Sequence, residues 1–216
     1  MAEKISECIR DEAFLLRSTA YGDDHRILSL LTAQNGRVDV IALGAKKSRR
    51  RFSTLDFLYC LEVEYQDSRR GGLHRLAHSE LAEDFAALRQ DYETTVQALG
   101  WLRLLLQVVP EGQHIAGVFS LLRGALRRLR AETREVTHLE FLRELLSRLG
   151  FHLELERCLR CSSPEAPHYY FSAEAGGLLC PSCRQTSGKS NMTLHQNFSS
   201  HRILAEAFRY HLGAKI

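Results

Sequence analysis

FLYCLEVEY, residues 57–65, is the stretch that decides the fold of the first third of this chain. Every second residue from Phe57 to Tyr65 is aromatic or aliphatic, and the residues between them become acidic at Glu62 and Glu64. Successive side chains of a strand point to opposite faces. The alternation therefore predicts a strand with one buried face and a second face that becomes polar towards its end.

Further strand signals surround this stretch. We predict strands over residues 13–16, 27–31, 37–43 and 73–79, with turns at Asn35-Gly36 and Gly71-Gly72. Five strands in so short a segment favour a small closed barrel, because closure removes the edges that an open sheet would expose.

After about Glu80 the spacing of apolar residues changes from every second residue to every third or fourth residue. We predict a helix over residues 92–109, a second from about residue 114, a third that ends at Gly150, and a last one that begins at Ser199 or Ser200. The expected fold class is therefore α+β, with a barrel domain over 1–80 and a helical domain over 81–216.

Four cysteines in two CxxC pairs lie in the helical region: Cys158, Cys161, Cys180 and Cys183. The 18 residues between the pairs are a typical spacing for structural zinc. We predict one Zn²⁺ per chain, in a module over about 156–186. Because four sulfurs fill all tetrahedral positions, this metal would support the fold and not catalyse. A disulfide framework is the alternative, but the chain is not small and loop-dominated, and we expect no apolar leader.

A basic run follows Gly44-Ala45 at the end of a predicted strand, and its cations are Lys46, Lys47, Arg49, Arg50 and Arg51. We expect a loop that binds the phosphates of single-stranded nucleic acid, with the nearby Phe52, Phe57 and Tyr59 as candidates for base stacking. The alternative is a solvated charge run beside ordinary core aromatics, and the sequence leaves both interpretations open.

A second basic group lies on the second predicted helix, where Arg123, Arg127 and Arg130 run beside an apolar stripe that includes Leu122 and Leu126. These arginines are candidates for binding a partner or DNA. The alternative is the solvated side of a helix.

Composition and motifs argue against a membrane protein and against an enzyme. The net charge is +3, and charged residues or glycine break the apolar stretches before membrane-spanning length, so we expect a soluble cytosolic protein. We find no glycine-rich phosphate loop, GxSxG elbow or HExxH helix. His78-Ser79-Glu80 resembles the HxE of a zinc deaminase, but no PCxxC follows at short distance.

Four short stretches have a family resemblance in their order and spacing: Ala13-Phe14-Leu15-Leu16-Arg17, Gly36-Arg37-Val38, Gly44-Ala45-Lys46-Lys47-Ser48, and residues 145–151 leading to the first cysteine pair. Together they resemble the RecO family of bacterial recombination mediators. The resemblance implies an N-terminal OB barrel and a helical C-terminal domain with a zinc module, without enzymatic activity. Relatives continue past the position of Leu212 with a short basic segment, which we expect this sequence to lack.

The resemblance also implies a function and partners. RecO-like proteins bind single-stranded DNA, anneal complementary strands and help load the RecA recombinase, together with RecR and the acidic tail of the single-stranded DNA-binding protein. The resemblance therefore also implies that the protein lies in the bacterial cytoplasm, associated with the nucleoid. Two alternatives remain from the residues alone: an RNA-binding barrel with a zinc module, and a protein-only structural adaptor, which would show no salt-dependent affinity for any oligonucleotide.

Overall fold

The computed structural model describes residues 8–48, 50–52, 54–68, 72–184, 191–194 and 200–214. The chain divides into two compact units, Met1–Arg134 and Glu135–Ile216. The expected α+β class is confirmed, because a β-barrel is followed by helices and a small sheet. The domain boundary expected after residue 80 falls inside the last strand of the barrel, His74–Asp84, and it stays a prediction.

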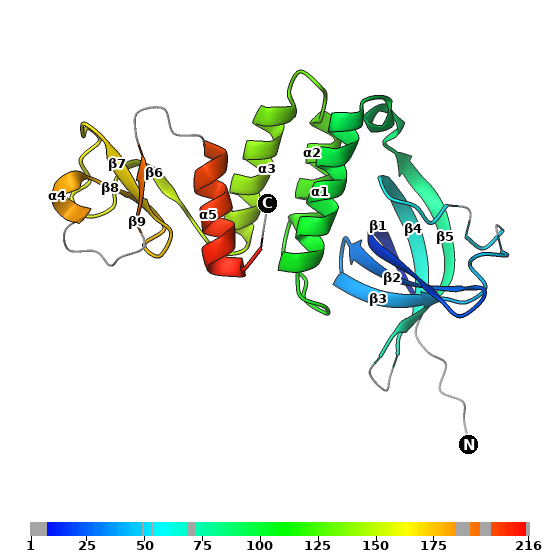
Figure 1. The fold of residues 1–216 in the computed structure, drawn as a ribbon. Coiled ribbons are helices and arrows are strands. Elements are labelled where there is room, and N and C mark those ends of the chain that lie inside the picture. The colour runs from blue at the N-terminus through cyan, green and yellow to red at the C-terminus, as the bar shows by residue number, and fades with distance from the viewer. Residues whose placement is uncertain are drawn as a thin grey trace. The chain divides into compact units, whose positions relative to one another are not determined.

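The first unit contains a closed five-stranded barrel with the strand order β1-β2-β3-β5-β4 (Figure 1). Its neighbouring strands are antiparallel except for β3 and β5, which run parallel. The strands are β1 (Cys8–Tyr21), β2 (His25–Thr32), β3 (Gly36–Ala42), β4 (Tyr59–Gln66) and β5 (His74–Asp84).

The barrel interior is filled by apolar residues from all five strands, including Leu61, Val63 and Tyr65 of the alternation that the sequence predicted. Leu15, Leu28, Val40, Leu61 and Leu76 come from the five different strands, and each is almost fully buried. The strand expected from Phe57 begins at Tyr59, because Leu58 has a left-handed backbone with a φ of 61°. The other face of the sheet also buries apolar groups, since the Phe14 ring lies 5.1 Å from that of Phe119.

The helical part of the first unit contains a 3-10 helix (Ala86–Gln90), α1 (Tyr92–Val108) and α2 (Val118–Arg128). The carboxylate of Asp91 accepts a hydrogen bond of 2.7 Å from the Thr94 backbone N–H and so caps α1. Gly36, at the turn between β2 and β3, has a φ of +69°, and a side chain there would lie 2.0 Å from the Gln113 carbonyl oxygen. This close approach joins the barrel to the segment after α1.

The second unit combines two longer helices with a four-stranded sheet of order β6-β8-β7-β9. Its helices α3 and α5 approach each other at the rings of His138 and His201, whose centroids are 5.5 Å apart. Its elements are α3 (Arg134–Arg148), β6 (Glu154–Cys158), β7 (Tyr169–Ser172), β8 (Gly177–Leu179), α4 (Pro181–Arg184), β9 (Asn191–Leu194) and α5 (Ser200–Leu212).

None of the helices in the described part of the chain has the length and apolar character needed to cross a membrane.

Candidate metal centre and candidate nucleic-acid interface

The two cysteine pairs converge, as their spacing predicted. The Sγ atoms of Cys158, Cys161, Cys180 and Cys183 all lie within 4.8 Å of one another. Strands β6 and β8 bring them together, because these strands pair in parallel and each leads into one CxxC turn.

The spacing of the sulfurs fits a tetrahedral metal. A Zn–S bond of about 2.3 Å places two thiolates of a regular tetrahedron about 3.8 Å apart. The Sγ atoms of Cys161 and Cys180 are 3.7 Å apart, far longer than the S–S bond of about 2.05 Å in a disulfide. The four cysteines are therefore compatible with a metal site, and their geometry favours it over the disulfide framework.

The lowered pKa values of two of the thiols also suit metal binding. Burial alone would raise the pKa of Cys158, but backbone N–H groups that point at its sulfur lower the pKa to about 6. The pKa of Cys180 is also lowered, first by a hydrogen bond with the Ser182 hydroxyl. The pKa of Cys183 is instead raised to about 12, mainly by its hydrogen bond to Cys180. Metal binding needs thiolates, and those of Cys158 and Cys180 are stabilised in advance by backbone N–H groups and by the Ser182 hydroxyl.

The basic run lies between β3 and β4, as expected, and we call residues 43–52 the basic loop. The Lys46 ammonium donates a hydrogen bond of 2.7 Å to the Asp23 carbonyl oxygen, and Lys47 forms an ion pair with the Asp24 carboxylate. Arg50 is exposed and makes no ion pair within the described residues. Arg49 lies outside the described residues.

The aromatic residues near the basic loop differ in their exposure. The Phe52 ring is only 4% exposed and belongs to the barrel core, with the Arg51 guanidinium 5.1 Å from its centroid. Phe57 and Tyr59 are partly buried against the same core, and Arg89 lies 4.4 Å from the Tyr59 centroid. For Phe52 the core interpretation is therefore favoured over that of a stacking platform.

The arginines of α2 make contacts that the sequence did not reveal. Arg123 forms ion pairs of 2.7 Å with Glu83 on β5 and 2.8 Å with Glu12 on β1. Arg127 also pairs with Glu83 at 2.7 Å, and this hydrogen bond is the largest cause of the lowered pKa of the Glu83 carboxyl. Two of the three arginines thus join the helix to the barrel. No local signal predicted this, because the acidic partners lie 40 to 111 residues away.

Arg130 has a different environment. Its guanidinium donates only to main-chain carbonyl oxygens among the contacts in the described chain, at 2.7 Å to Leu129 and 3.1 Å to Arg127. Together with Arg127 and the acidic Glu83 and Asp84 it lines a hollow of about 160 Å³. The apolar wall of this hollow includes Phe85, Leu88 and Leu126. We call this hollow the α2 pocket.

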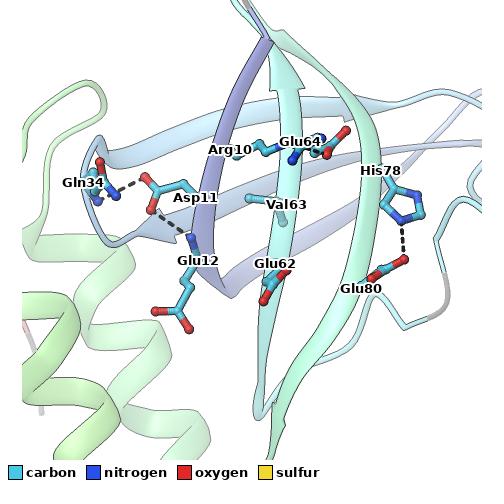
Figure 2. A pocket seen from close by; sticks show the side chains of 9 residues that line it. All are labelled: Arg10, Asp11, Glu12, Gln34, Glu62, Val63, Glu64, His78 and Glu80. Atoms are coloured by element: carbon cyan, nitrogen blue, oxygen red, sulfur yellow. Dashed lines mark hydrogen bonds and ion pairs between the residues drawn. The ribbon is translucent and has the colours of Figure 1, made fainter.

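An acidic surface covers the outside of β1, β4 and β5 around a hollow of about 490 Å³ (Figure 2). Glu12, Glu62 and Glu80 form a row of like charges across the three strands. The neighbouring Glu64 pairs with Arg10 at 2.7 Å, and Glu80 pairs with His78 at 2.8 Å. The alternation in the sequence predicted that Glu62 and Glu64 point outward, but the row follows from strand register. This surface would repel phosphates and so favours the basic loop as the nucleic-acid side of the barrel.

Comparisons with known proteins cover both units. A family model described as "Recombination protein O N terminal" matches residues 6–85, and one described as "Recombination protein O C terminal" matches residues 89–207. The chain is 32% identical over 179 residues to the DNA repair protein RecO of Bacillus pumilus, covering 81% of this chain and 68% of that protein. The corresponding protein of Pelobacter propionicus is 31% identical, with coverages of 80% and 70%, and that of Myxococcus xanthus is 29% identical, with coverages of 92% and 82%.

Proposed function

This chain belongs to the RecO family of DNA repair proteins, and we propose that it acts as a non-enzymatic mediator that binds single-stranded DNA and anneals complementary strands. The observation that carries the proposal is the exposed basic loop on a closed barrel whose β1-β4-β5 face is acidic. This distribution of charge supports a path for the phosphate backbone along one side of the barrel.

Annealing needs no covalent bond to be made or broken in this mechanism. Two single strands repel each other through their phosphates, and lysine and arginine side chains that bind those phosphates release counterions and lower the repulsion. Binding both strands to one protein surface also raises their local concentration. The protein then accelerates base pairing by charge neutralisation and proximity.

The cofactor in this proposal is one structural Zn²⁺ held by Cys158, Cys161, Cys180 and Cys183. A four-sulfur site leaves no position for water or substrate, so the metal would stabilise the small sheet of the second unit and take no part in strand annealing. The donor set supports zinc, because thiolate ligands in tetrahedral geometry are those that zinc prefers.

We propose the acidic tail of the single-stranded DNA-binding protein as a partner at the α2 pocket. The wall of Phe85, Leu88 and Leu126 would accept a terminal apolar side chain, while Arg130 and Arg127 would meet acidic groups. Arg123 would support this site by holding α2 to Glu83 and would not contact the tail. We further propose that the protein acts with RecR to help load the RecA recombinase. This role would be carried out in the cytoplasm, at the nucleoid.

The test is a salt titration of binding to labelled single-stranded DNA and to RNA of the same sequence, followed by an annealing assay. We expect salt-dependent affinity, a preference for DNA and faster annealing of complementary strands. A preference for RNA would favour an RNA-binding barrel. Absence of salt-dependent binding to both would favour a protein-only adaptor and contradict the proposal.

A further inference from the structure

We infer that the Asp24 carboxylate competes with DNA phosphate for Lys47, so that this acidic turn lowers the affinity of the basic loop for single strands. The inference rests on the proposed function of the loop. It concerns a residue in the turn between β1 and β2, outside the basic run itself.

The first observation is the ion pair between Asp24 and Lys47. The Lys47 side chain is 76% exposed and is therefore placed where a phosphate can reach it, whereas that of Asp24 is 29% exposed. A carboxylate and a phosphate both accept hydrogen bonds from an ammonium group. The phosphate must therefore displace Asp24 before it can use all three donors of Lys47.

The second observation is that hydrogen bonds from main-chain N–H groups of the loop hold it against this turn and the start of β2, independently of this ion pair. The Lys46 N–H donates a hydrogen bond of 3.1 Å to the Asp24 carbonyl oxygen, and the Gly44 N–H donates one of 2.9 Å to Nδ1 of His25. Neither contact uses the Asp24 carboxylate. Removing that carboxylate therefore frees the Lys47 side chain while the loop backbone keeps its attachment.

The adjacent Asp23 provides a matched control within the same turn. Its carbonyl oxygen accepts a hydrogen bond from Lys46, but its carboxylate makes no hydrogen bond or ion pair within the described residues. Asp23→Asn and Asp24→Asn remove the same charge from neighbouring positions. A general electrostatic effect on DNA would be similar for both variants, whereas direct competition for Lys47 predicts an effect that is specific to Asp24.

The experiment measures fluorescence anisotropy of a labelled single strand at several salt concentrations. An exposed ion pair contributes little free energy, so we expect Asp24→Asn to raise the affinity for the single strand by about two- to five-fold. The change in affinity caused by Asp23→Asn should be less than half as large. The slope of log affinity against log salt should become steeper by up to about 0.7 for Asp24→Asn, because one more cation is available to a phosphate. Circular dichroism checks that both variants are folded.

The double variant Asp24→Asn with Lys47→Ala completes the test. Asp24→Asn should give no gain in the Lys47→Ala background, because the group for which Asp24 competes is gone. Equal gains for Asp23→Asn and Asp24→Asn, or an undiminished gain without Lys47, would overturn the competition while leaving the basic loop as the DNA site. A wild-type protein that binds no single strand would overturn both proposals.

Discussion

Arg37 donates a hydrogen bond of 2.9 Å from its guanidinium to the carbonyl oxygen of Val109, which joins strand β3 of the barrel to the end of helix α1. The same guanidinium nitrogen lies 3.0 Å from the Leu106 carbonyl oxygen. Carbonyl groups at the end of a helix have no partner within the helix, and a cation there also interacts favourably with the helix dipole. The barrel thus caps α1, which supports folding of these elements as one unit.

The first prediction concerns the stability of this connection. Arg37→Ala should lower the free energy of unfolding by about 1–3 kcal/mol, because it leaves partly buried carbonyl groups without a charged donor. Urea denaturation measures the difference. Arg10→Ala is the control, since the Arg10 side chain is 81% exposed and forms a surface ion pair with Glu64. The expected loss for this variant is below about 1 kcal/mol. Equal losses for the two variants would contradict the role assigned to Arg37.

The second prediction concerns pH and Glu83. Hydrogen bonds from Arg127 and Arg123 lower the pKa of this carboxyl below its ordinary value of 4.5, although burial opposes the shift. Because the folded state holds the carboxylate more strongly than the unfolded state, its stabilisation is complete above pH 4.5 and is lost as the pH falls towards the lowered pKa.

Glu83→Gln should therefore destabilise the protein by about 1 kcal/mol at pH 7, a value reduced for the solvent exposure of Arg127. The difference in the free energy of unfolding between this variant and the wild type, measured from denaturation curves, should become smaller below pH 4.5. Glu80→Gln, on the same strand but 68% exposed, should change stability less. A destabilisation by Glu83→Gln that is the same at pH 7 and below pH 4 would disprove the ion-pair origin.

The third prediction is one zinc per chain, measured by elemental analysis of protein purified without chelators. Cys158→Ser and Cys180→Ser should reduce the zinc content to near zero and unfold the small sheet of the second unit, because the metal would join β6 to the turn after β8. Cys8→Ser removes an exposed thiol far from the cluster in sequence and should keep the zinc. Wild-type protein that contains no zinc and does not gain stability when zinc is added would refute this assignment.

The fourth prediction concerns the DNA path. Replacing Lys46, Lys47, Arg49, Arg50 and Arg51 by Ala should weaken single-stranded DNA binding for all sequences. Loss of three or four phosphate contacts should reduce the magnitude of the salt slope by roughly two to three, at about 0.7 per contact. Annealing should slow in parallel, while circular dichroism remains unchanged.

A charge-matched control separates the loop from the net charge of the protein. It replaces five exposed arginines elsewhere by Ala, namely Arg103, Arg143, Arg157, Arg202 and Arg209. The loop variant should lose much more affinity than this control. If the loop variant stays folded and keeps both its affinity and its salt slope, the DNA path lies elsewhere.

The fifth prediction concerns the α2 pocket. Arg130→Glu should weaken binding of a labelled acidic peptide with an apolar C-terminal residue by about ten-fold, because a charge-assisted contact is replaced by repulsion. Arg128→Glu, an exposed position on the same helix, should have a much smaller effect. We prefer Arg130 to Arg127 for this test, since Arg127→Glu would also break the ion pair with Glu83. Unchanged affinity in Arg130→Glu would remove the α2 pocket from the proposed function.

The sequence by itself determined the features that depend on short-range patterns. Alternation from Tyr59 to Tyr65 specifies a strand with a buried face, and the helical period after residue 91 specifies amphipathic helices, because backbone geometry sets both periods. The CxxC spacing likewise predicted that four sulfurs converge, since each turn presents two cysteines on one side.

Only the tertiary structure decided which charges remain available. Arg123, Arg127 and Arg130 look alike in the sequence, yet Glu83 and Glu12 pair with the first two, and Arg130 contacts main-chain carbonyls. Strand register and barrel closure bring together acids and bases that are far apart in the chain, and no local pattern encodes such a partner. The pairing of Lys47 with Asp24 arises in the same way, because the barrel places the β1–β2 turn beside the basic loop.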